Sequence, residues 1–126
     1  MKAIIDTNIL VQYLIKTDKK SVENIINFIN EYDQLVIKQS VFMESIFLLE
    51  NKINLSRNII DREIFCLINN PIFEFDLEFD IYLFLSLYTS YTSLDVIDIY
   101  LLIKSKNEKV LSLDIDLNKK INSIKI

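Results

Sequence analysis

Glycine, histidine and tryptophan are absent from this sequence of 126 residues, which contains one cysteine and one proline. Without glycine the chain cannot form a phosphate-binding loop, a dinucleotide-binding fingerprint or a glycine-flanked serine elbow, since each needs backbone that glycine permits. Without histidine it cannot build Ser-His or Cys-His nucleophile pairs or histidine-ligated zinc sites. Any enzymatic chemistry must therefore rest on carboxylates, hydroxyls and lysines.

Cysteine usage and hydropathy predict a cytoplasmic protein. The single Cys66 cannot close an intrachain disulfide, which suits a reducing compartment. The longest apolar stretches, such as Ile81–Leu85, fall far short of the ~20 residues that span a bilayer. Asp6 comes too early for the apolar core of a signal peptide. We expect no membrane association.

Length and charge indicate one acidic domain over residues 1–126, in which 51% of the residues are hydrophobic. The net charge of −4 is unfavourable for binding nucleic acid by phosphate neutralisation alone. A nucleic-acid role would need a bound cation or local basic patches. The lysines that could flank a substrate, although they are better explained as solvated surface groups, are Lys16, Lys19, Lys20, Lys104, Lys106 and Lys109. Arg57 and Arg62 lie near one face of the same predicted helix and could equally contact RNA or an acidic partner segment.

Short apolar segments alternate with helical periodicity along the chain. Strands are predicted at Lys2–Ile5, Leu35–Ile37, Ile72–Phe75, Lys109–Leu113 and Ser123–Ile126. Helices are predicted at Thr7–Lys16, after Ser21, at Val41–Ile53, Arg57–Ile68 and Glu78–Tyr88, from Thr92 to Lys106, and between Asp114 and Ser123. This alternation indicates a three-layer α/β/α domain around a central parallel sheet of four to five short strands.

Polar residues at the predicted helix ends indicate caps. Ser21, Ser40 and Ser56 each precede a helical segment. Thr92 and Asp95 have the spacing of a capping box. Asn107 stands where glycine often ends a helix, and it could take the left-handed conformation.

Four acids stand out by their surroundings. Asp6 and Asp114 each follow an apolar strand-like segment, and ligands of parallel sheets bind outside the carboxyl ends of the strands. Glu44 and Asp98 lie within apolar segments that are predicted to be helical, where a carboxylate is costly unless it is paired or bound to a metal. The four could converge on one crevice.

Each acid also has a structural interpretation. Asp6 could cap the helix that begins at Thr7. Glu44 is placed in the first turn of its helix, where it favours the dipole, and taken alone this is the better explanation of that residue. Asp95 is better explained as a capping-box acid than as a ligand. Asp114 could be a turn residue, with Asp116 capping the next helix. The arrangement of the acids taken together, rather than any one of them, indicates a functional site.

The segment Ile4-Ile5-Asp6-Thr7-Asn8-Ile9-Leu10 resembles the opening motif of PIN-domain ribonucleases. Glu44, then Asp98, then Ser112-Leu113-Asp114-Ile115-Asp116-Leu117 resemble the later motifs of that family in order and spacing. The chain is also similar in size to VapC-type toxins of toxin–antitoxin pairs. It departs from the family in lacking the glycine usual after the third acidic helix, where Asn107 stands, and in having Ser112 where threonine is common.

The resemblance implies a PIN-like fold and hydrolysis of RNA phosphodiester bonds. Because the donors are oxygens only, the implied cofactor is one or two ions of Mg²⁺ or Mn²⁺. The expected ligands, direct or through water, are Asp6, Glu44, Asp98 and Asp114, with Asp116 as a further candidate. The hydrogen-bonding groups behind them would be Thr7, Asn8 and Ser112. The implied partners are RNA and an antitoxin protein. The apolar helix around Tyr82–Tyr88 is by default explained by core packing, and a homodimer interface on it is a hypothesis that the resemblance favours.

Two other classes of protein remain as alternatives. The first is a catalytically inactive PIN-like module whose acids are structural. The second is a phosphatase or phospho-acceptor domain, but the usual paired acids near the first strand and the late lysine are not found in this sequence.

Overall fold

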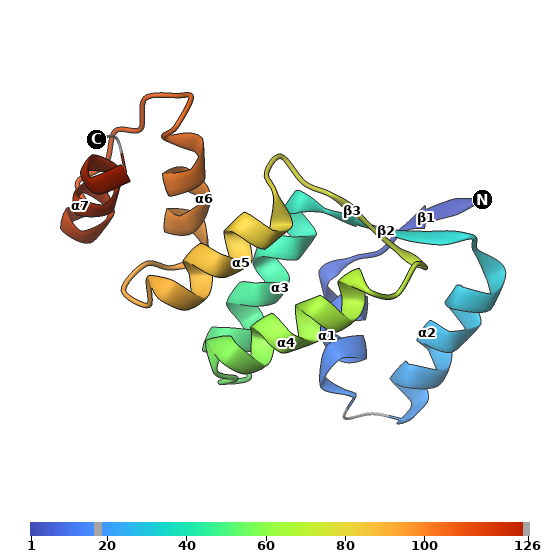
Figure 1. Cartoon of the computed structure of the whole chain (residues 1–126). Helices are drawn as coiled ribbons and strands as arrows, with labels where there is room; N and C mark the ends of the chain where they lie inside the picture. The colour runs from blue at the N-terminus through green and yellow to red at the C-terminus, as the bar shows by residue number, and fades with distance from the viewer. Residues whose placement is uncertain (17–18, 125–126) are drawn as a thin grey trace. The chain divides into compact units, whose positions relative to one another are not determined.

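The computed structural model describes residues 1–16 and 19–124. The chain forms two compact units, Met1–Glu78 and Phe79–Ile126. Within the described residues, all strands belong to the first unit, and the second unit is helical (Figure 1). Each unit is described by itself.

In the first unit, each strand is followed by helices before the next strand begins. The elements in order are β1 (Lys2–Ile4), α1 (Thr7–Ile15), α2 (Lys19–Glu31), β2 (Gln34–Lys38), α3 (Gln39–Asn51), α4 (Arg57–Ile68) and β3 (Phe73–Asp76). The strands are parallel and lie in the order β1-β2-β3. The carboxyl ends of the three strands therefore lie at the same end of the sheet.

The two faces of this sheet differ in chemistry. Parallel crossovers are right-handed, and two successive crossovers in one direction place their helices on the same face. Leu35 and Ile37 on that face are 1% and 0% exposed, and they belong to a core with Leu10, Phe42 and Ile46. An open hollow of about 450 Å³ is lined by Lys2, Ala3, Ile4, Val36, Lys38, Glu74, Phe75 and Asp76. All of these except Ala3 and Phe75 alternate along the strands with the positions of Leu35 and Ile37 and so belong to the opposite face.

The sheet has three strands in the described residues, where the sequence predicts four to five. The predicted strand at Lys109–Leu113 is an irregular segment. Leu111 and Leu113 are 85% and 101% exposed, so the apolar character of this segment is not matched by burial. A strand exists only where a neighbour completes its backbone hydrogen bonds, and an apolar run does not specify that neighbour.

The predicted strand at Ser123–Ile126 is also wrong over the residues that are described. Helix α7 (Ile115–Ile124) includes Ser123 and Ile124, while residues 125–126 lie outside the described residues. Leu117 and Ile121 are buried, and their spacing of four places both on one face of the helix. The helical period therefore extends past the predicted boundary.

Several predicted helix ends shift. Ser56 caps α4 as expected, accepting from the Ile59 N–H at 3.3 Å. Helix α3 begins one residue before Ser40, with Lys38 at the N-cap position, and α2 begins at Lys19, before Ser21. Among the described residues, positive φ angles occur at Lys16 (51°) and Asn54 (64°), so Asn107 is not left-handed.

In the second unit, α5 (Ile81–Ser90), α6 (Val96–Lys104) and α7 pack around aromatic and aliphatic side chains. The Phe79 and Phe84 rings stack with centroids 5.0 Å apart, and Phe84 stacks on Tyr88 at 5.9 Å. Asp80 caps α5 through the Tyr82 and Leu83 N–H groups. In the part of the chain that is described, no helix has both the length and the apolar character needed to cross a bilayer.

Candidate active site

Asp6 lies at the carboxyl ends of the strands, just beyond β1. Ile5 continues the ladder, because its N–H donates to the Val36 carbonyl at 3.1 Å. Asp6 is the N-cap of α1, and its Oδ1 accepts from the Ile9 N–H at 2.9 Å. The side chain is exposed. A carboxylate has about four lone-pair sites, so capping leaves it able to accept from, or coordinate, another group.

A contact between α1 and α3 links this strand end to Glu44. Thr7 Oγ1 donates to Glu44 Oε2 at 3.4 Å. The structure therefore brings together Glu44 and the Asp6–Thr7 turn, which are far apart in the sequence. Asn8, the next residue, is exposed and lines a groove of about 240 Å³ with Gln12 and Asn24.

The helix-dipole interpretation of Glu44 is wrong. Because α3 begins at Gln39, Glu44 lies in the second turn, and the first turn carries no acid. The dipole effect falls off beyond the first turn. Glu44 is exposed, while its neighbours Met43 and Ser45 are 8% and 0% exposed.

In the second unit, Asp95 and Asp98 cap α6 reciprocally. The Asp98 N–H donates to Asp95 Oδ1 at 2.8 Å, and the Asp95 N–H donates to Asp98 Oδ2 at 3.3 Å. The capping box therefore begins at Asp95, three residues later than the predicted start at Thr92. Both acids have a structural role, so Asp95 alone does not account for the cap.

Asp114 caps α7 and is itself held by a turn. Its Oδ1 accepts from the Leu117 N–H at 2.7 Å, and its own N–H donates to Ser112 Oγ at 3.0 Å. The Asn118 side-chain amide donates to the Ser112 carbonyl at 2.8 Å. Ser112 thus fixes the backbone that carries Asp114. Asp116 lies exposed in the first turn of α7 and is not the cap.

Asp98 and Asp114 are close enough to repel each other. Burial raises the pKa of the Asp98 carboxyl, the negative charges of Asp95 and Asp114 raise it further, and the Asp95 N–H opposes the shift. Clustered carboxylates favour a bound cation, because a positive charge relieves their repulsion.

The oxygen donors of the candidate residues are of the type that binds a hard cation, although they do not form a complete metal site. Among the described residues, no three acidic or cysteine side chains are grouped to hold a metal ion. The oxygen donors of the first unit are Asp6, Glu44 and the Thr7 hydroxyl, and those of the second unit are Asp98 and Asp114. Carboxylate and hydroxyl oxygens are the donors that Mg²⁺ and Mn²⁺ prefer.

The basic candidates have varied surroundings. Arg57 Nε donates to Glu50 Oε1 at 3.0 Å, with side chains 13% and 25% exposed, and so joins α4 to α3. Arg62 on the same helix is exposed. Lys104 lies 3.9 Å from Glu108 and 6.0 Å from the Tyr100 ring centroid. Lys16 lies 5.6 Å from the Tyr13 ring centroid.

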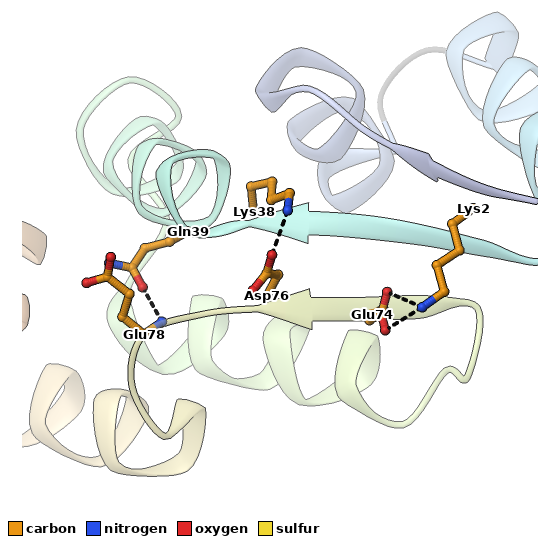
Figure 2. Close-up of polar contacts among 6 residues, drawn as sticks. All are labelled: Lys2, Lys38, Gln39, Glu74, Asp76 and Glu78. Atoms are coloured by element: carbon orange, nitrogen blue, oxygen red, sulfur yellow. Dashed lines mark hydrogen bonds and ion pairs between the residues drawn. The ribbon is translucent and has the colours of Figure 1, made fainter.

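Sequence reasoning missed the ion pairs on the open face of the sheet. Lys2 Nζ lies 2.9 Å from Glu74 Oε1, and Lys38 Nζ lies 2.6 Å from Asp76 Oδ2 (Figure 2). Beside them, the Glu78 N–H donates to the Gln39 side-chain carbonyl. These partners are 38 to 72 residues apart, so only the strand pairing reveals them.

Fold and site together define a mixed α/β protein with acids at strand and helix ends. Residues 3–121 match the family described as PIN domain, and the chain belongs to that family. PIN domains are generally nucleases that use divalent metal ions. No curated protein and no solved structure was found to match the chain.

Proposed function

We propose that this PIN domain is a metal-dependent endoribonuclease and the toxin of a type II toxin–antitoxin pair, similar to VapC-type proteins. The observation that carries the nuclease proposal is the Thr7–Glu44 contact, which gathers two family-motif positions at the carboxyl end of β1. Ligands of parallel α/β domains bind outside the carboxyl ends of the strands. A cytoplasmic location belongs to the same proposal.

In this proposal the metal ligands are Asp6, Glu44, Asp98 and Asp114, and Asp116 is a further candidate ligand. One or two Mg²⁺ or Mn²⁺ ions held there would supply positive charge against the phosphate and lower the pKa of water. Thr7 orients Glu44 through its hydroxyl, and Ser112 orients Asp114 by accepting from the Asp114 N–H. Asn8 offers a side-chain amide close to Asp6 in the chain. The caps at Asp6, Asp98 and Asp114 fix their carboxylates before RNA binds, which reduces the cost of ordering them.

The partners are RNA, an antitoxin and a second copy of the chain. The exposed apolar residues Tyr82 and Leu83 on α5, which are 54% and 43% exposed, favour a homodimer through this helix. The alternative function is an inactive PIN-like binding module. It is favoured by the capping roles of Asp6, Asp98 and Asp114, which would preserve these acids without catalysis.

The test is cleavage of labelled total RNA with Mg²⁺ or Mn²⁺, with and without EDTA. Asp98→Asn is compared with Asp95→Asn, its matched partner in the capping box. We expect metal-dependent cutting that Asp98→Asn abolishes and Asp95→Asn largely retains. A folded wild type that binds no metal and cuts no RNA would favour the binding module. Equal loss in both variants would mean that the α6 cap, rather than the Asp98 carboxylate as a ligand, is what matters.

A further inference from the structure

The open face of the sheet carries two similar ion pairs, formed by lysines at opposite ends of the strands. Lys2, the first residue of β1, pairs with Glu74, which is level with Val36 in the middle of β2, and Lys38 pairs with Asp76 where β2 and β3 end (Figure 2). The Lys2 and Lys38 side chains are 59% and 45% exposed. Both lysines lie on the same face of the sheet, pair with an acid and are exposed to solvent. They differ in their position along the strands.

The strand register, continued past the end of β1, brings Asp6 level with Lys38. Ile4, the last residue of β1, is level with Val36 on the neighbouring strand, and the Ile5 N–H donates to the Val36 carbonyl. Asp6 follows β1 as the N-cap of α1, and Lys38 is the last residue of β2, so both lie where their strands end. Lys2 is four residues upstream of Asp6, roughly 13 Å away along β1.

Lys38 is also the N-cap residue of α3, and α3 carries Glu44. The carboxyl end of the sheet thus holds the acids Asp6, Glu44 and Asp76 together with Lys38. With a net charge of −4, the chain as a whole repels a polyanion. A local cation at the reacting edge is therefore more useful than one elsewhere.

We propose that Lys38 binds an RNA phosphate next to the one that is cleaved, and that Asp76 holds its ammonium group at the edge until RNA arrives. This rests on the proposed nuclease function. Exposed ion pairs contribute little to stability, so exchanging Asp76 for a phosphate costs little. The ammonium is a compact charge with three donors on a flexible stem, which suits this exchange.

The experiment measures kcat/KM for cleavage of one single-stranded RNA at several KCl concentrations. The variants are Lys38→Gln, the matched control Lys2→Gln, and the charge swap Lys38→Asp with Asp76→Lys. The swap keeps the ion pair and net charge but moves the ammonium one strand further from Asp6. Thermal unfolding of each variant confirms that it is folded.

We expect Lys38→Gln to lower kcat/KM about tenfold, the loss of one charged hydrogen bond. It should also reduce the slope of log kcat/KM against log[KCl] by about 0.7, as for one phosphate contact on a single strand. The swap should behave like Lys38→Gln, and Lys2→Gln like the wild type.

Equal cleavage by Lys38→Gln and Lys2→Gln would overturn the inference and leave the nuclease proposal intact. A swap variant that cleaves as well as the wild type would overturn it too, because the position of the charge would not matter. A wild type that binds Mn²⁺ but cleaves no RNA would instead overturn the nuclease proposal, and this inference with it.

Discussion

Three of the four candidate ligands of this PIN domain are also helix caps. Asp6 caps α1, Asp98 shares the cap of α6, and Asp114 caps α7. Each of these carboxylates meets the positive end of a helix, and Asp6 in addition follows a strand of a parallel sheet, where ligands bind. The structural role and the proposed chemical role therefore coincide at these residues, and mutations must be chosen to separate them.

Substitutions at Asp6 separate the two roles. Asn caps helices about as well as Asp, whereas Ala costs about 1 kcal/mol. We expect Asp6→Asn to keep the wild-type free energy of unfolding in EDTA and Asp6→Ala to lower it by about that amount. Both should abolish RNA cleavage. Urea unfolding measures the first quantity, and strong destabilisation by Asp6→Asn would show that the charge itself is structural.

Asp98 should make the stability of the metal-free protein depend on pH. Burial raises its pKa in the folded state above that of the unfolded chain, so ionisation costs stability as the pH rises between the two values. Asn keeps an acceptor for the Asp95 N–H and carries no charge. Asp98→Asn should therefore raise the Tm in EDTA by an amount that grows from pH 4 and levels off above the folded-state pKa. A difference independent of pH would contradict this.

At the scale of elements, helix packing in the first unit depends on a half-buried ion pair. Glu50 near the end of α3 and Arg57 at the start of α4 meet at 3.0 Å. This contact closes the connection between two helices that pack on one another. It also gives Arg57 a structural role, whereas the sequence left RNA and an acidic partner as its targets.

Removing Arg57 should destabilise the protein. Arg57→Gln leaves Glu50 with a weaker partner in a site that is mostly shielded, which costs on the order of 1–2 kcal/mol. The control is Arg62→Gln on the exposed side of the same helix, expected to change stability by less than about 0.5 kcal/mol. Equal effects in urea unfolding would show that the Glu50–Arg57 contact contributes nothing specific.

At the scale of the whole molecule, the elements of the first unit follow from local patterns, and the strand count does not. Apolar segments predicted β1, β2 and β3 within one or two residues, and Ser56 was predicted as a cap. The Lys109–Leu113 segment has the same apolar character, but in the structure no strand forms there. A strand forms only when a partner strand from elsewhere in the chain pairs with it, and the composition of a segment does not identify that partner.

Assembly can be tested on α5. If two copies meet through its exposed apolar residues, Leu83→Glu should convert a dimer into a monomer at micromolar concentration, because a charge is costly in an apolar interface. Light scattering measures the mass. The control is Ile26→Glu on α2, a residue 48% exposed and so comparable to Leu83, which should leave the mass unchanged. A monomeric wild type would contradict the dimer.

The sequence by itself determined the α/β class, the positions of β1, β2 and β3, the four motif acids and the exclusion of glycine- and histidine-dependent chemistry, because residue type and spacing are local properties. Only the tertiary structure decided that Thr7 contacts Glu44, that Asp95 and Asp98 share one cap, and that Lys38 pairs with Asp76. The Thr7–Glu44 and Lys38–Asp76 contacts depend on strand register and helix packing between distant segments. The shared cap depends on which residue begins α6, and the capping motif allowed more than one start.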